Sequence, residues 1–259
     1  MNKMPYEYFL FEKHDRIAAI TINRPPMNVL HIPAIAELNR ILDAVVNDET
    51  VHFILFKGAG EKAFSAGVDI KDHTLDKVEG MLKNFHQIFR TLYRSSKLSM
   101  ASVHGYCLGG GMELATFCDL VIASDNTVFG QPEIKVGCYP PVAAALLPRL
   151  TGAKRAFEIA MLGETFSAQQ ALAIGLINQV VPYPQLQKTT DDWIAKLSKM
   201  SGAVLHHTKR ALLAGVNESF DAALNEAERI YLNDLIRTDD LTEGVQAFME
   251  KRNPSWKHR

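Results

Sequence analysis

The spacing of hydrophobic residues near the N-terminus has a period of two. The alternation runs on both sides of the polar stretch KHDR and involves Phe9, Phe11, Ile17, Ala19 and Thr21. Alternation around a polar turn predicts a β-hairpin. Two prolines, Pro25 and Pro26, are expected to end it.

The next part of the chain alternates between helical spacing and short apolar runs. Helical spacing appears over residues 32–48 and 81–96. Short apolar runs, which predict buried strands, occupy residues 51–58, 99–105 and 119–125. A brief helix is expected from Met112, between the last two strands.

From about Gly137 onward the pattern is mostly helical. Helical periodicity occurs over residues 153–163, 167–175, 186–200, 203–215, 220–236 and 242–252. Only residues 177–183 have the composition of a strand. We therefore predict an α/β fold, with a core over residues 1–195 and a helical part over residues 196–259.

Composition places this pattern in an ordinary globular protein. The 259 residues are 47% hydrophobic and 22% charged, with a formal net charge of −1. This balance gives no indication of a nucleic-acid or membrane surface, and no apolar run is long enough to span a membrane. The three cysteines are odd in number and lack metal-ligand spacing, so we expect free thiols, no metal and a cytoplasmic location.

Two glycine-containing loops follow predicted strands, at residues 56–71 and 104–115. The second contains Gly109, Gly110 and Gly111 just before Glu113, at the start of a helix. Glycine lets a ligand approach the backbone, and the free N–H groups of a helix start favour negative charge. The alternative is a tight turn with close packing of helix on strand. Residues 58–63 of the first loop also fit a dinucleotide-binding pattern, but no amphipathic helix follows them, which disfavours that interpretation.

Two glutamates are candidates for acid–base chemistry. Glu113 follows the glycines, and Glu133 lies in the segment FGQPEIKVG after the next predicted strand. A glutamate in the mouth of a pocket can act as general acid or base when burial and a neighbouring carboxylate alter its pKa. Because a strand separates the two, only the tertiary fold can bring them together.

Three segments, in this order and spacing, resemble the enoyl-CoA hydratase (crotonase) family: GEKAFSAGVDIK, GYCLGGGMELATFCDLVIAS and FGQPEIKVG. The segment INRPPMNVL and the tail GVQAFMEKRNPSWK are similar as well, so the resemblance covers nearly the whole chain. It implies a spiral of ββα units with a helical C-terminal trimerisation part. It also implies a homotrimer or hexamer.

The resemblance assigns roles to individual residues. The backbone N–H groups of Val68 and Gly110 would form an oxyanion hole for a thioester carbonyl. Glu113 would activate water for addition at Cβ, and Glu133 would give a proton to Cα. Coenzyme A, which is part of an acyl-CoA substrate and not a cofactor, would contact Ser65, Ala66 and Lys71, although Lys71 could equally be a solvated lysine.

One segment departs from the family pattern. Where many family hydratases have a glycine whose N–H helps to hold water, this chain has Pro141, followed by Val142, Ala143 and Ala144. Proline has no N–H. The variant resembles cyclic dienoyl-CoA hydratases of anaerobic aromatic degradation, such as cyclohexa-1,5-diene-1-carbonyl-CoA hydratase. An isomerase or acyl-CoA hydrolase of the same family, and a non-catalytic CoA-binding member, are the alternatives.

Overall fold

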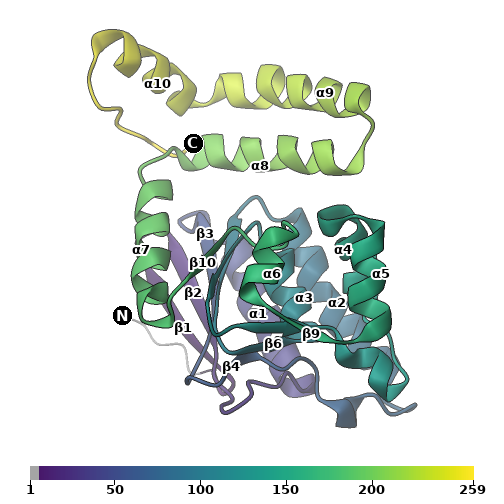
Figure 1. Ribbon diagram of the computed structural model, residues 1–259. Coiled ribbons are helices and arrows are strands. Elements are labelled where there is room, and N and C mark those ends of the chain that lie inside the picture. The colour runs from purple at the N-terminus through teal and green to yellow at the C-terminus, as the bar shows by residue number, and fades with distance from the viewer. Residues whose placement is uncertain (1–5) are drawn as a thin grey trace. The chain divides into compact units, whose positions relative to one another are not determined.

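The computed structural model describes residues 6–259 (Figure 1). The chain divides into two compact units. The first comprises residues 6–95 and 99–190, and the second comprises residues 96–98 and 191–259. The division falls within helix α7 (Leu186–Leu197).

The first unit is built on a large sheet. Within residues 6–259 its strand order is β1-β2-β3-β5-β7-β10. The bounds are β1 Phe9–His14, β2 Ile17–Ile22, β3 Phe53–Gly58, β5 Leu98–Val103, β7 Leu120–Ser124 and β10 Gln179–Val181. The predicted hairpin is confirmed as the antiparallel pair β1–β2, whose turn contains Asp15 at φ 50°. Strand β2 pairs in parallel with β3, β5 with β7, and β7 with β10. Parallel strands buried on both faces are typically apolar runs, as β3 and β7 are.

Two long helices supply much of the core of this unit. Helix α1 (Ile32–Val46) and helix α2 (Val78–Arg94) each bury one apolar face. The buried residues recur at helical spacing: Ile35, Leu38, Ile41, Leu42 and Val45 on α1, and Met81, Phe85, Ile88, Phe89 and Leu92 on α2. The predicted helices at both places are therefore confirmed, with the buried stripe that their spacing indicates.

A second, smaller sheet has the strand order β4-β6-β8-β9 within the described residues. Its strands are only three residues long: β4 Ala63–Ser65, β6 Tyr106–Leu108, β8 Val128–Gly130 and β9 Thr165–Ser167. Strands β4, β6 and β8 run parallel, and β9 pairs antiparallel with β8. Four helices complete the first unit: α3 Gly110–Phe117, α4 Pro141–Thr151, α5 Ala153–Leu162 and α6 Ala168–Ala173. Short 3₁₀ turns occupy Ile70–Asp72, Pro132–Val136 and Tyr183–Gln185.

The second unit is helical, as predicted for the C-terminal part. Its helices are α8 Gly202–Asn217, α9 Phe220–Arg229 and α10 Asp239–Glu250. One π-helical turn, Ile230–Asp234, and one 3₁₀ turn, Leu235–Arg237, connect α9 to α10. Helices α8 and α9 lie side by side and antiparallel (Figure 1). Buried Lys209 of α8 donates to the carbonyl of Lys97 at 2.8 Å, which ties residues 96–98 to this unit.

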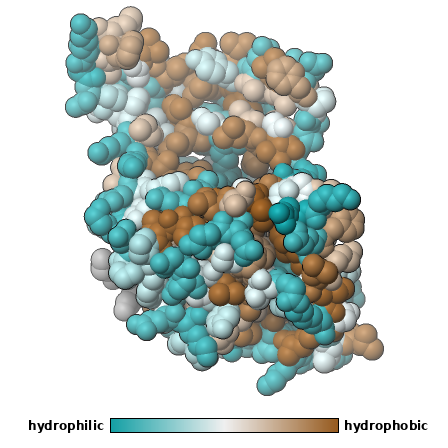
Figure 2. Space-filling model, viewed as in Figure 1, coloured by the Kyte–Doolittle hydropathy of each residue, from teal (hydrophilic) through white to brown (hydrophobic). Residues whose placement is uncertain are grey.

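Many large hydrophobic side chains of the second unit are exposed, and brown surface is visible over its helices in Figure 2. They are Met200, Leu212, Val216, Phe220, Leu224, Tyr231, Leu232, Ile236, Val245, Phe248 and Met249. Contiguous exposed apolar surface is typical of an interaction site. None of the helices among the described residues is both long and apolar enough to cross a membrane.

The structure differs from the predicted elements in several ways. Strands β4, β6 and β8 of the small sheet were not predicted. Helix α3 begins at Gly110 rather than at Met112. Helix α4 was not predicted, because Pro140 and Pro141 read as a loop, whereas proline suits the first turn of a helix. The expectation of a single strand after Gly137 is wrong, since β9 is also a strand and is too short to show alternation.

Candidate active site

The small sheet brings three loops of the first unit together. Strands β4, β6 and β8 are parallel neighbours, so their carboxyl ends lie at the same edge. The loop after β4 contains Val68, α3 begins directly after β6, and the 3₁₀ turn after β8 contains Glu133. Ligands of parallel sheets commonly bind at such an edge. Val68 and Glu133, which lie 65 positions apart in the sequence, therefore meet at one edge of this sheet.

Two glycines of the second loop, Gly109 and Gly111, lie very close to atoms of neighbouring residues. A Cβ at Gly111 would lie 2.3 Å from the carbonyl oxygen of Ser65. A Cβ at Gly109 would lie 2.7 Å from Oε1 of Glu133, and Gly109 has a φ of 51°. The Ser65 carbonyl belongs to the backbone and leaves no room for a Cβ at Gly111. At Gly109 the Glu133 side chain could turn aside, but the positive φ favours glycine.

The Val68 and Gly110 backbone groups lie beside one another. A Cβ at Gly67, whose φ is 92°, would lie 2.9 Å from the Gly110 nitrogen. The Val68 side chain approaches Gly110 from the same side, with Cγ2 at 3.1 Å from a Cβ built there. Gly110 is the first residue of α3, where the N–H groups have no helical partner. Neither the Val68 nor the Gly110 N–H donates to another described residue, so both are available to a ligand oxygen.

Glu113 is buried, with 3% of its surface exposed. Its Oε1 accepts a hydrogen bond of 2.8 Å from the Ala143 N–H, in the first turn of α4. Burial raises the pKa of Glu113 to about 8, the Ala143 N–H opposes this shift, and the charge of Glu133 adds to it. The carboxyl can therefore change its protonation state near neutral pH.

Glu133 is half-buried in the 3₁₀ turn Pro132–Val136. Burial raises its pKa, and its own backbone N–H opposes the rise. Fully buried Gln131 lies beside it. In the orientation that satisfies both ends of the Gln131 amide, its nitrogen donates to both carboxylate oxygens of Glu133 at 3.1 Å.

The two glutamates and the two backbone donors line one cavity of about 460 Å³. Of the residues predicted from the sequence, the cavity brings together Ala66, Val68, Gly110, Glu113 and Glu133. Pro141 lines the same cavity.

Two of the predicted CoA contacts lie outside the lining of this cavity. Ser65 is fully buried, with its hydroxyl donating to the Asn28 carbonyl at 2.8 Å. Lys71 is exposed, and its backbone N–H donates to Asp69 at 3.0 Å. Their contacts to CoA stay predictions.

Helix α2 supplies a wall of the cavity that the sequence reasoning missed. The residues it contributes are Val78, Met81, Leu82, Phe85 and His86. Their helical spacing was visible in the sequence, but it identified only a buried face and not a ligand site. The Ala143 contact to Glu113 was missed in the same way, because nothing local to either residue indicates it.

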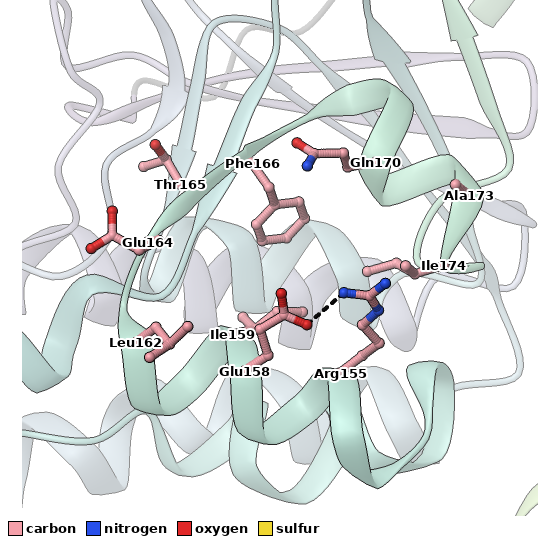
Figure 3. Close-up of a pocket in the computed structure, with 10 residues that line it drawn as sticks. All are labelled: Arg155, Glu158, Ile159, Leu162, Glu164, Thr165, Phe166, Gln170, Ala173 and Ile174. Carbon is pink, nitrogen blue, oxygen red and sulfur yellow. Dashed lines mark hydrogen bonds and ion pairs between the residues drawn. The ribbon is translucent and has the colours of Figure 1, made fainter.

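A second cavity of about 230 Å³ lies between α5, β9 and α6 (Figure 3). Its charged side chains and Gln170 are engaged with the protein. Arg155 pairs with Glu158 at 2.5 Å, as Figure 3 shows. Glu164 pairs with Lys135 at 2.9 Å, and Oε1 of Gln170 accepts from the Ser167 backbone. This cavity contains none of the predicted site residues, so the larger one is the candidate site.

Metal-binding clusters are absent from residues 6–259, where no group of three or more His, Cys, Asp or Glu side chains is placed to hold an ion. The arrangement offers two carboxyl groups and two backbone N–H donors instead. It is suited to polarising an oxygen and moving protons beside it.

Comparisons with a family model, with curated proteins and with solved structures all point to the same family. Residues 12–259 match the model of the enoyl-CoA hydratase/isomerase family. The probable enoyl-CoA hydratase echA8 of Mycobacterium bovis is 35% identical, over 99% of this chain and 100% of the relative. The crotonyl-CoA hydratase of Syntrophomonas wolfei is 33% identical, over 98% and 99%. The crystal structure of the Geobacillus kaustophilus enoyl-CoA hydratase matches with a TM-score of 0.94 at 28% identity, over 100% and 99% of the two chains.

Proposed function

Because this chain belongs to the enoyl-CoA hydratase/isomerase family, we propose that it adds water to the double bond of an α,β-unsaturated acyl-CoA thioester. The observation that carries this proposal is the meeting of Glu113, Glu133 and the Gly110 backbone on one cavity. Relatives named as hydratases support it further.

The two carboxyl groups suit the two proton transfers of a hydration. The raised pKa of Glu113, about 8, makes its ionised form a stronger base toward water than an ordinary carboxylate, and the ionised fraction grows as pH rises toward 8. Water then adds at Cβ. Glu133, whose pKa is also raised, is able to hold a proton and donate it to Cα. Paired carboxyl groups whose environments differ commonly divide acid and base roles in this way.

The backbone donors suit the charge that develops on the thioester. Addition at Cβ moves electron density to the carbonyl oxygen. The Val68 and Gly110 N–H groups, which donate to no other described residue, can donate hydrogen bonds to that oxygen. The N-terminus of α3 adds its partial positive charge at Gly110. One lost donor in such a site typically costs about 3 kcal/mol in the transition state. No further cofactor is required, since coenzyme A belongs to the substrate.

Replacing each carboxyl group by an amide tests the proposal. We expect Glu113→Gln and Glu133→Gln each to lower the hydration rate by roughly 10²–10⁴-fold. Loss of the conjugated enoyl-thioester absorbance reports the rate. Unchanged circular dichroism and thermal melting would show that each variant still folds. Near-normal turnover in either variant would remove its assigned role.

For the acyl group, we propose a cyclic dienoyl-CoA. Pro141 lines the cavity and begins α4, so it offers no N–H to a water. The alkene carbons of a flat ring are fixed in place, so the ring can accept a water held mainly by the two glutamates. The test compares kcat/KM for cyclohexa-1,5-diene-1-carbonyl-CoA and crotonyl-CoA. A higher value for crotonyl-CoA would leave a short-chain hydratase, the activity that the name of the Syntrophomonas relative states.

The three alternatives give different results with the same substrates. An isomerase would move the double bond without taking up oxygen from ¹⁸O-water, and a hydrolase would release free CoA. A non-catalytic member would bind the thioester and change nothing. Incorporation of one ¹⁸O atom into an intact thioester distinguishes hydration from all three.

A further inference from the structure

The wall that α2 gives to the cavity is hydrocarbon except at one residue. Val78, Met81, Leu82 and Phe85 present apolar side chains, and His86 alone on this helix presents a hydrogen-bonding group to the cavity lining. An apolar wall suits the hydrocarbon part of an acyl chain or ring. A single polar group within such a wall can give specificity for a ligand that carries a matching polar group.

The imidazole of His86 has no hydrogen-bond partner in the described part of the chain. Its Nε2 atom is shielded from solvent and unpaired, and no bond to its other ring nitrogen is found. Burial and the nearby Arg90 lower the pKa of His86, so at neutral pH the ring is uncharged with one donor and one acceptor. Buried polar groups are normally satisfied, and one that is not calls for an explanation.

His86 lies close to the backbone donors proposed for the thioester carbonyl. Its ring centroid is 6.4 Å from that of Phe85. Phe85 in turn abuts Gly110, with its Cζ at 2.8 Å from a Cβ built there. An acyl group whose carbonyl sits at Gly110 therefore lies within reach of the imidazole.

We propose that His86 is a specificity-determining residue that hydrogen-bonds a hydroxyl or oxo oxygen carried by the acyl group. The inference rests on the proposed function in that the cavity must hold an acyl thioester. Because the χ2 torsion of histidine is broad and roughly two-fold, the ring can make a half-turn that exchanges the positions of its nitrogen and carbon atoms. A hydrocarbon acyl group would leave the imidazole unpaired, so within any acyl class the oxygenated member is preferred.

Binding of saturated thioesters tests this without any turnover. We would measure dissociation constants by calorimetry for hexanoyl-CoA and for its 4-, 5- and 6-hydroxy analogues. At least one hydroxy analogue should bind about tenfold more tightly than hexanoyl-CoA. In His86→Phe that preference should vanish while hexanoyl-CoA binds at least as well. A protein that binds hexanoyl-CoA better than every analogue, or a His86→Phe variant that keeps the preference, would overturn the proposal.

Two further variants locate the effect. His14→Phe makes the same replacement at an exposed position outside the cavity and should leave every dissociation constant unchanged. Tyr139→Phe removes the hydroxyl of another residue that lines the cavity. Loss of the preference in Tyr139→Phe but not in His86→Phe would assign recognition to Tyr139 and refute the role of His86.

Turnover of the matching 2-enoyl-CoA thioesters tests the role of His86 separately from the proposed hydratase function. Hydration of trans-2-hexenoyl-CoA without preference for its hydroxy analogues, in binding or in kcat/KM, would refute the inference alone. Absence of hydration with every thioester, alongside a His86-dependent binding preference, would refute the hydratase function and leave the recognition role of His86 supported.

Discussion

At the scale of single residues, the carboxyl group of Glu113 lies where its neutral form is favoured. Its side chain is almost fully buried, and burial is the largest cause of its raised pKa. The backbone N–H groups of Ala143 and Val142 offset only part of this effect. A group held in this way is ready for proton transfer and also makes stability depend on pH.

The pH dependence of stability follows from the direction of that shift. An unfolded Glu113 ionises near its ordinary pKa of 4.5, and the folded residue keeps its proton up to about 8. The folded state binds more protons across this interval, so the free energy of unfolding falls as pH rises through it. The slope is at most about 1.4 kcal/mol per pH unit.

Glu113→Gln should lack this contribution. Urea unfolding at a fixed protein concentration, from about pH 5 to about pH 9, should show the native protein losing stability relative to the variant until about pH 8, after which the difference levels off. Parallel curves over the whole range would mean that Glu113 titrates alike in both states.

Pro141 carries the second residue-level prediction. Pro141→Gly places a free N–H at the first position of α4, on the cavity wall. We expect the ratio of kcat/KM for crotonyl-CoA to that for the cyclic dienoyl-CoA to rise, because a flexible chain depends more on a well-placed water. Misplacement by about 1 Å can cost roughly 10²-fold. An unchanged or falling ratio would show that Pro141 does not govern how the water is held.

At the scale of elements, the position of α3 depends on contact between backbones. The helix starts so close to β4 that a Cβ at Gly111 would meet the Ser65 carbonyl at 2.3 Å. The contact is with backbone, which cannot turn aside as a flexible side chain can. The glycine pattern that first suggested a ligand site therefore also reports the packing that builds this site.

The same substitution, glycine to alanine, should therefore change stability in opposite directions at two positions. Gly111→Ala should destabilise the protein by about 1–3 kcal/mol, because helix or strand must shift. Gly215→Ala, at an exposed site of α8 with open space around it, should stabilise it by roughly 0.5–1 kcal/mol. Thermal melting of both variants measures the difference. A Gly111→Ala protein that melts like the native one would show that α3 has room to move.

At the scale of the whole molecule, the helical unit leaves a large apolar surface uncovered. Phe220 is 78% exposed and Phe248 is 85% exposed. Surface of this kind is unusual on a monomer and is typical of an interface. It agrees with the trimer or hexamer expected from the family resemblance.

We therefore predict that light scattering will give three or six times the 28.8 kDa mass of the chain. Phe248→Asp should shift the protein toward smaller species, since it buries a charge in the proposed interface. Leu75→Asp changes a hydrophobic residue of the first unit that is even more exposed, and it should leave the assembly intact. A native protein that scatters only as a monomer would refute the prediction.

The periodicity of the sequence by itself determined the hairpin, helices α1 and α2, the apolar strands and the helical C-terminal unit. It succeeds there because alternation or helical spacing over many residues reports which side of an element is buried. It failed at α4 and at the three-residue strands of the small sheet, where too few residues repeat. The motifs determined the family and the candidate glutamates.

Only the tertiary structure decided that Glu113 and Glu133 share a cavity. Their meeting depends on the parallel pairing of β6 with β8, in which Leu108 lies opposite Gly130. The contact of Ala143 with Glu113 and the exposure of His86 to the cavity depend likewise on distant elements. A local pattern shows that a side chain is buried but not what it is buried against, because hydrogen bonds and contacts between distant segments leave no period in the sequence.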